Sequence, residues 1–150
     1  MKGVAAAMLT PIRIEHEEQL KEAYRIRTEV FVHEQGVPQE LEIDDNEAVS
    51  SHVLVLYNGE PAGAGRMREV DGIAKLERIC VLASHRKHRV GAAIMKELEA
   101  LALDKGLAKA KLHAQTHAAG FYEKLGYSVD SETFMEEGIP HIRMIKKLVP

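Results

Sequence analysis

Residues 76–102 constrain the fold more than any other stretch of the sequence. Residues 76–82 are apolar apart from Glu77 and Arg78, which is typical of a short strand covered on both faces. From Val90 to Ala102, apolar residues recur at three- and four-residue spacing, which predicts an amphipathic helix. A buried strand, a short turn and a helix are therefore expected in direct succession.

The turn between this strand and this helix is strongly basic. It reads His-Arg-Lys-His-Arg over residues 85–89, and Gly91 follows. A helix start offers free backbone N–H groups and a partial positive charge, so it can hold an anion, and a glycine lets the anion approach the backbone. A phosphate-binding loop and a solvated helix cap fit this pattern equally well. Neither the Walker nor the dinucleotide-binding glycine spacing is present.

Composition limits the class of protein. A chain of 150 residues that is 45% apolar fits one globular domain spanning 1–150. A net charge of −3 argues against a general nucleic-acid partner, and no apolar run is long enough to cross a membrane. The single cysteine, Cys80, excludes an internal disulfide framework and suits a reducing compartment. We expect a cytoplasmic protein, and the sequence leaves a homodimer open.

Hydrophobic periodicity and turn residues predict an α/β fold, with a mixed central sheet and helices on both of its faces. Residues 30–35 could extend the first helix or be irregular, and residues 39–51 fit a loop or a short helix. A break is expected at 138–140. The expected strands are 11–15, 52–57, 62–70, 76–82, 108–114, 127–133 and 141–148, and the expected helices are 17–30, 90–102 and 117–125.

Residues 112–127 form a second informative stretch. An apolar strand-like run leads into a short helix that carries Phe121 and Tyr122 and ends at Gly126. With residues 76–102, this predicts two adjacent parallel strands, and such strands bind ligands where their carboxyl ends diverge. Tyr122 would lie near that opening, where its phenol could donate a proton to a leaving thiolate. Packing of the Phe-Tyr pair against the sheet is the commoner alternative for an arbitrary tyrosine.

Together the two stretches resemble the GNAT superfamily of acyl-CoA-dependent N-acyltransferases, and within it the ElaA-like and YjcF-like bacterial branch. Residues 86–91 resemble the cofactor motif Arg/Gln-x-x-Gly-x-Gly/Ala, and residues 121–127 resemble the motif Phe-Tyr-x-x-x-Gly-Tyr/Phe. The chain departs from the pattern at Arg89, where the first motif glycine usually stands, and at Gln115, where many members have Asn. The branch resemblance adds residues 27–35, 42–44, 63–66, 113–115 and 138–141.

The resemblance implies acetyl-CoA as co-substrate, a small-molecule or peptide amine as acceptor, and no metal. The pantetheine would pair with the main chain of Ile79, Cys80 and Val81, as an added strand does. The acceptor side would include Arg27, Glu34, Gln35 and His141. The pyrophosphate loop would comprise Arg86, Lys87, His88, Arg89, Val90, Gly91 and Ala92, with Gln115, Phe121 and Tyr122 as further cofactor contacts.

An amine must reach the thioester in its neutral form, so a base is useful. Glu77 is the first candidate, because burial at the start of an apolar strand could raise its pKa. A structural ion pair of Glu77 with Arg66 or Arg78 is an equally good alternative. A backbone N–H of the central strand could stabilise the oxyanion, and Tyr122 could reprotonate the CoA thiolate.

Other candidate groups are weaker. Cys80 lies between Ile and Val and is more often a core residue than a nucleophile. His113 and His117 lack the glutamate that a zinc helix carries after its first histidine. The acidic residues at 40–47 suit a solvated loop or the rim of the acceptor site. We therefore predict an N-acetyltransferase. The alternatives are an acyltransferase similar to acyl-homoserine-lactone synthases and a non-catalytic CoA-binding module.

Overall fold

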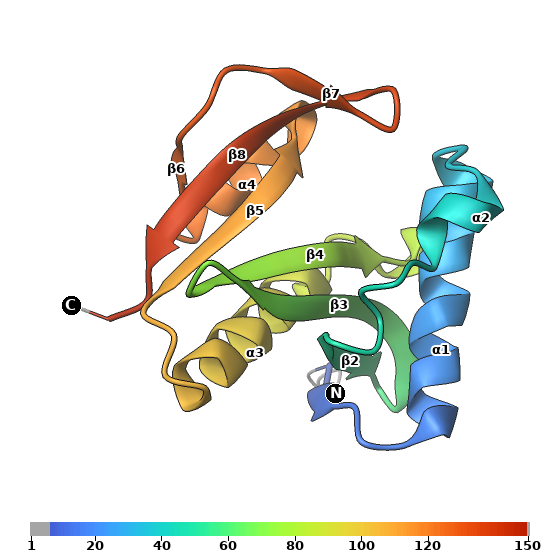
Figure 1. The fold of residues 1–150 in the computed structure, drawn as a ribbon. Helices are drawn as coiled ribbons and strands as arrows, with labels where there is room; N and C mark the ends of the chain where they lie inside the picture. Colours follow the sequence, from blue (N-terminus) through green and yellow to red (C-terminus); the bar gives the residue numbers. More distant parts are fainter. Residues whose placement is uncertain (1–6, 150) are drawn as a thin grey trace, which may run out of the picture.

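The structure is a computed structural model, and it describes residues 7–149. Within them the chain forms an eight-stranded mixed sheet in the order β1-β2-β3-β4-β5-β8-β6, with β7 paired to β8 (Figure 1). In chain order the elements are β1 (Leu9–Arg13), α1 (Glu17–Arg27), the π-helix η1 (Thr28–Glu34), α2 (Gln39–Glu42), β2 (Ser51–Tyr57), β3 (Glu60–Val70), β4 (Ile73–Val81), the 3-10 helix η2 (Ala83–His85), α3 (Val90–Asp104), β5 (Lys109–Gln115), the 3-10 helix η3 (Thr116–Ala118), α4 (Ala119–Lys124), β6 (Ser128–Val129), β7 (Phe134–Glu136) and β8 (Ile139–Lys147).

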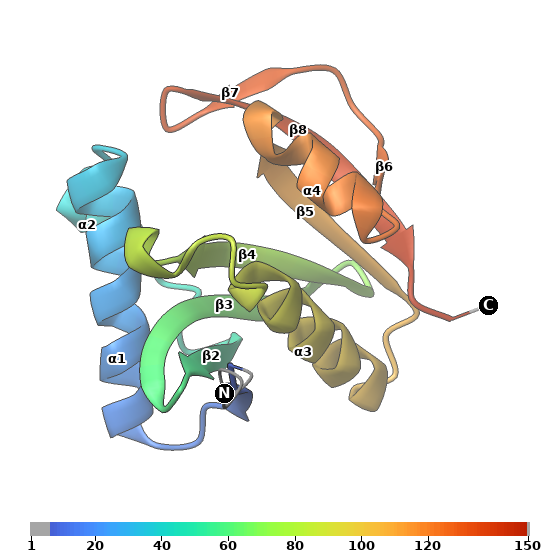
Figure 2. The ribbon, with the colours of Figure 1, turned by 180° about the vertical axis from the view of Figure 1, so that it is seen from behind.

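Helices cover both faces of the sheet, as the sequence predicts. On one face α1 packs Ala23 and Ile26 against β2, β3 and β4. On the other face α3 and α4 lie over the sheet, and the apolar side of α3, including Ile94 and Leu98, forms the main core (Figure 2). Among residues 7–149, no helix has the length and apolar character needed to cross a membrane.

Two glycines of β3 allow α3 to pack closely on the sheet. A Cβ at Gly63 would lie 2.8 Å from Ile94 Cδ1 and 2.9 Å from the carbonyl oxygen of Cys80. A Cβ at Gly65 would lie 2.8 Å from Ile94 Cγ2. Any side chain at these positions would push α3 away from the sheet, and α3 begins at the basic turn.

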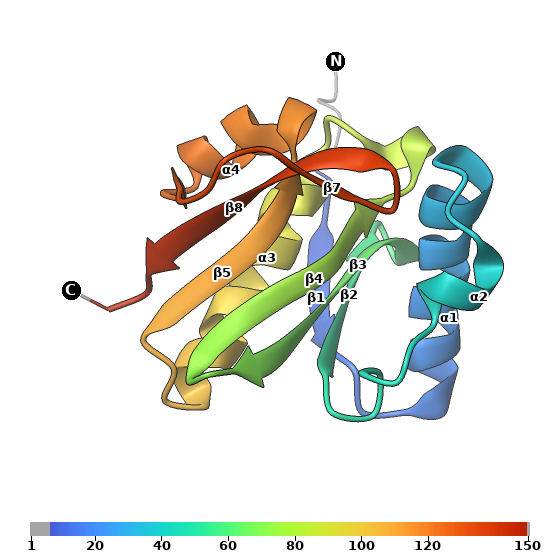
Figure 3. The ribbon, with the colours of Figure 1, turned by 45° about the horizontal axis from the view of Figure 1, so that its top comes forward.

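Strands β4 and β5 are parallel neighbours that part after three residue pairs. Their pairing covers Ala74–Leu76 and Ala110–Leu112. In β4 the pairing with β3 then shifts, and Arg78 has a positive φ of 56°, which marks a β-bulge. The bulge bends β4 away from β5, so the two strands diverge toward their carboxyl ends (Figures 1 and 3). The expectation of two diverging parallel strands is confirmed.

Two local expectations are wrong. The strand expected over 127–133 is limited to β6, because polar residues 130–132 follow it, and the chain then forms the unexpected strand β7. The break expected at 138–140 lies one residue earlier. Glu137 and Gly138 have positive φ values of 51° and 72° and make the tight turn, so Ile139 and Pro140 already belong to β8. Residues 28–34 continue the first helix as a π-helix.

Candidate active site

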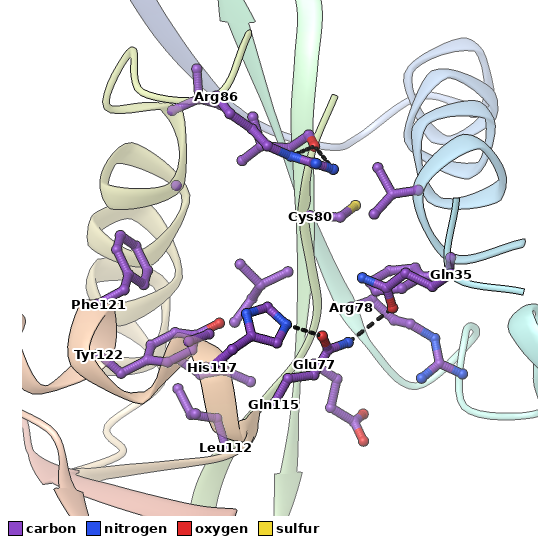
Figure 4. A pocket seen from close by; sticks show the side chains of 18 of the residues that line it. Gln35, Glu77, Arg78, Cys80, Arg86, Leu112, Gln115, His117, Phe121 and Tyr122 are labelled. Carbon is purple, nitrogen blue, oxygen red and sulfur yellow. Dashed lines mark hydrogen bonds between the residues drawn. The ribbon is translucent and has the colours of Figure 1, made fainter. Parts of the chain in front are cut away.

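A cavity of about 950 Å³ fills the opening between β4 and β5. Its walls come from η1, β4, the basic turn, the start of α3, the end of β5, α4 and the β7–β8 hairpin. Figure 4 shows lining residues from β4, the end of β5 and α4. A second cavity of about 80 Å³ adjoins it beside Gln35, Arg78 and His141, which line both. The cavity therefore brings together most of the site residues that the sequence suggests.

The basic turn takes a backbone path that usually calls for glycine. Lys87 and Arg89 have positive φ values of 69° and 64°, and Arg89 is the N-cap of α3. Arg89 thus occupies a left-handed conformation, which a glycine adopts without strain and a non-glycine residue adopts at a cost of roughly 1–2 kcal/mol. With arginine at this position, the backbone still follows a path that leaves the N–H groups at the start of α3 available to bind an anion.

Gly91 lines the cavity and lies beside α4. Its φ is not positive, and an added Cβ would lie 3.1 Å from Phe121 Cζ. The glycine therefore makes room for the aromatic ring of α4 beside the start of α3. His88 contacts the Tyr57 ring, at 5.1 Å between centroids, and does not line the cavity, unlike Lys87, Val90 and Ala92.

Arg86 connects the basic turn to η1. Its Nη2 donates to Glu34 Oε1 at 2.6 Å and to the carbonyl oxygen of Val81 at 3.1 Å. The hydrogen bond from Arg86 holds the pKa of Glu34 below its usual value. Of the β4 residues expected to pair with pantetheine, Ile79, Cys80 and Val81 all line the cavity, and the Val81 carbonyl already accepts from Arg86.

Tyr122 points its hydroxyl into the cavity from α4 (Figure 4). The side chain is buried, and burial raises the pKa of Tyr122 to about 12. Phe121 packs edge-on against its ring, with the centroids 5.0 Å apart. At neutral pH the phenol therefore stays protonated and can donate to an atom that becomes negative in the cavity.

The expectation that burial raises the pKa of Glu77 is wrong. Burial does act to raise this pKa, but three cationic side chains outweigh it and lower the pKa of Glu77. The Glu77 carboxylate accepts hydrogen bonds from Arg68 at 2.8 Å and from Arg66 at 3.1 Å, and Lys75 Nζ lies 3.2 Å from it. The ion-pair alternative with Arg66 is thus what the structure contains, while Arg78 contacts Glu42 and Asp44 instead. Glu77 still lines the cavity.

Cys80 is held as a neutral thiol. Its side chain is buried, its Sγ lies 3.9 Å from the carbonyl oxygen of Ala64, and burial raises its pKa to about 12. A thiol with such a pKa carries almost no thiolate at neutral pH. The preference for a core role over a nucleophilic one agrees with this environment.

On the acceptor side, Gln35 at the end of η1 and Gln115 at the end of β5 meet across the cavity. Gln115 Nε2 donates to Gln35 Oε1 at 2.9 Å, and His117 Nε2 lies 2.7 Å from Gln115 Oε1 (Figure 4). Glu34 and His141 also line the cavity. Arg27 does not: its side chain is 1% exposed and pairs with Glu42 and Glu47, so its expected contact with the acceptor is absent.

Sequence reasoning missed one cluster of the cavity wall. His113 Nδ1 lies 2.9 Å from Glu136 Oε1, and the other Glu136 oxygen lies 3.6 Å from His141 Nε2. Phe134 packs edge-on against the His113 ring. Glu136 and Phe134 belong to β7, the strand that the sequence did not predict. Within residues 7–149, no group of three or more potential ligand side chains is placed to hold a metal ion.

Diverging parallel strands, a basic turn at a helix start and a tyrosine in the opening define an acyl-CoA-dependent N-acyltransferase. Residues 12–148 match the family described as "Acetyltransferase (GNAT) domain", so the chain belongs to the GNAT family. The predicted fold and class of enzyme are confirmed.

Three relatives illustrate the similarity. The uncharacterized N-acetyltransferase YjcF of Bacillus subtilis is 56% identical over 133 residues, which are 87% of this chain and 94% of YjcF. The ElaA protein of Escherichia coli is 31% identical over 87% of this chain and 89% of its own length. The crystal structure of an acyl-CoA N-acyltransferase from Pseudomonas aeruginosa superposes with a TM-score of 0.80 at 25% identity, covering 93% of this chain and 99% of that one. The resemblance to the ElaA-like and YjcF-like branch is confirmed.

Proposed function

We propose that this protein transfers an acetyl group from acetyl-CoA to the primary amine of a small molecule or peptide, by direct attack in a ternary complex. The observation that carries the proposal is the buried Tyr122 hydroxyl, which faces the opening between β4 and β5. A protonated phenol in this position suits the departure of a thiolate.

The cofactor side of the cavity suits acetyl-CoA. The pyrophosphate would be held by the backbone N–H groups at the start of α3, with Arg86, Lys87 and Arg89 adding positive charge. Beyond the bulge at Arg78, the edge of β4 facing β5 is unpaired and could take the pantetheine as an added strand. Cavity-lining residues of α4 and η3 would close the other side.

In the reaction, the neutral amine attacks the thioester carbon, a C–N bond forms and the C–S bond breaks. The thiolate takes the phenolic proton of Tyr122, which recovers a proton from the new amide nitrogen. A backbone N–H of β4 would donate to the oxyanion. Glu77 stays a candidate base, although its three cationic partners weaken it in that role.

The test replaces Tyr122 with Phe. Losing a general acid typically costs about 10²–10⁴-fold in rate, so we expect kcat to fall within that range while the Kd for acetyl-CoA changes little. Tyr127→Phe is the matched control, because the Tyr127 hydroxyl is bonded to Glu99 at 2.9 Å and does not line the cavity. Equal kcat values for the two variants would exclude Tyr122 as the acid.

A further inference from the structure

Deprotonation of the amine needs a base that is not already paired with cationic side chains, and Glu77 is paired with three of them. Its carboxylate accepts hydrogen bonds from Arg66 and Arg68 and pairs with Lys75. These contacts lower its pKa and occupy both oxygens. Another side chain of the cavity wall is therefore better suited to accept the proton.

His113 lies where the cavity begins. Leu112 is the last β5 residue paired with β4, and His113 follows it directly. Leu112 and Ala114 point into the core beneath α3, so His113 and Gln115 project from the opposite face of the sheet. Both side chains line the cavity.

Glu136 fixes the orientation of the His113 ring. A carboxylate only accepts hydrogen bonds, so the 2.9 Å contact places a proton on His113 Nδ1. The pKa of Glu136 is lowered, first by this hydrogen bond, which keeps the carboxylate charged. Phe134 holds the ring edge-on at 5.0 Å between centroids. Nε2 is then the nitrogen with the free lone pair, and within residues 7–149 it has no hydrogen-bond partner.

Three other histidines line the cavity. His85 Nδ1 lies 2.8 Å from Ser84 Oγ, so a hydroxyl and not a carboxylate orients its ring. His117 Nε2 contacts Gln115 Oε1 at 2.7 Å. His141 Nδ1 donates to the carbonyl oxygen of Ile139 at 2.7 Å, and its Nε2 faces Glu136. His113 is the cavity histidine whose carboxylate partner leaves a lone pair open, which is the arrangement of a carboxylate-oriented general base.

We propose that His113, oriented by Glu136, is the general base that removes a proton from the acceptor ammonium group; this rests on the proposed function. Nε2 takes one proton from R–NH₃⁺ and releases it to solvent, and the neutral R–NH₂ then attacks the thioester. Tyr122 gives its proton to the thiolate and regains one from the amide nitrogen. The sum is one amide, one CoA thiol and one released proton. His113 is a catalytic residue in this scheme, and Glu136 is a positioning residue.

The test compares His113→Asn with the wild type in a CoA-release assay with acetyl-CoA and the primary amines ethylamine, ethanolamine and lysine amide. The Asn amide can keep the hydrogen bond to Glu136 while removing Nε2. We expect turnover of these alkylamines at pH 7 to fall about 10²-fold or more. The matched control is His33→Asn, because His33 makes the same Nδ1 contact, with Glu29 at 3.0 Å, outside the cavity.

Two readouts separate a base from a structural residue. Hydroxylamine is weakly basic and already neutral at pH 7, so His113→Asn should lose much less turnover with it than with ethylamine. With ethylamine, the variant rate should climb with pH as the neutral amine accumulates. Glu136→Gln should shift the pH profile of the rate toward lower pH, because an imidazolium loses its stabilising partner when the carboxylate becomes a neutral amide. The titratable groups near the ring are Glu136 of β7, His141 and Arg143 of β8, and the Lys75–Glu77 pair of β4; Arg143 is the cross-strand partner of His113.

The outcomes also separate this inference from the proposed function. No amine-dependent CoA release by the wild type would overturn both. Wild-type turnover that His113→Asn retains, or loses equally with hydroxylamine and ethylamine, would overturn the inference alone. A long-range ¹H–¹⁵N NMR spectrum of the wild type gives an independent check. Neutral His113 should carry its proton on Nδ1, and a proton on Nε2 would contradict the proposed orientation.

Discussion

Arg89 lies in the turn that we propose binds the pyrophosphate. Two substitutions at Arg89 distinguish the contribution of the backbone conformation from that of the positive charge. Arg89 has φ 64° and ψ 15°, is exposed, and lines the cavity. Arg89→Ala removes the charge and keeps a Cβ in the left-handed region, whereas Arg89→Gly removes both. Because a Cβ there costs roughly 1–2 kcal/mol and glycine loses up to about 1 kcal/mol in chain entropy, we expect Gly to be more stable than Ala by about 1 kcal/mol.

Thermal unfolding and calorimetric titration with acetyl-CoA make the comparison. For a chain of this size, about 1 kcal/mol corresponds to a difference in Tm of about 2–4 °C between the two variants. Both lose the same charge, which contributes about 1 kcal/mol or less at the surface, so each should bind acetyl-CoA up to about five-fold more weakly than the wild type. This loss should shrink in high salt. Tenfold tighter binding by Arg89→Gly than by Arg89→Ala would refute the claim that the present turn already has the binding conformation.

Two further predictions concern stability. Gly63→Ala should lower the free energy of unfolding by about 1–3 kcal/mol, because its Cβ would lie 2.8 Å from Ile94 and 2.9 Å from a carbonyl oxygen. The control is Gly120→Ala, whose added Cβ would have no atom within 4 Å. Its free energy of unfolding in urea should equal that of the wild type or be slightly higher. An equal loss of unfolding free energy in both variants would contradict the packing argument. Burial raises the pKa of Glu47, but Arg27 lowers it more, to about 2. The ionised Glu47 carboxylate therefore adds about 2–3 kcal/mol to the free energy of unfolding above about pH 5, and this stabilisation is lost as the pH falls toward 2. The difference in unfolding free energy between the wild type and Glu47→Gln should narrow over that range. A constant gap would count against this ion pair.

The strand-turn-helix of residues 76–102 was predictable because its signals are local. Apolar runs, spacing and turn residues lie within a few positions of one another, and the structure places β4 and α3 over these residues. The bulge at Arg78 carries no such signal, since a non-glycine residue takes the positive φ in response to pairing with β3. The same holds for β7, which forms only against β8.

Side-chain partners were harder to predict than positions. Lys75 and Glu77 are two residues apart on one strand and therefore share a face, so their pairing was readable, but Arg68 reaches Glu77 from β3. Arg27 stands within the apolar stripe of α1, which indicates a buried ion pair rather than a ligand contact. The His113–Glu136 contact joins β5 to a strand that the sequence did not reveal.

We propose above that the cavity between β4 and β5 binds acetyl-CoA and an amine together. Initial rates of CoA release, measured while acetyl-CoA and an amine are varied against each other, test it most directly. A ternary complex requires amine-dependent release with intersecting reciprocal plots, and we expect this release to be lost in Tyr122→Phe. Parallel plots would indicate an acetylated enzyme, and acetyl-CoA binding without release to any amine would contradict the proposed transferase.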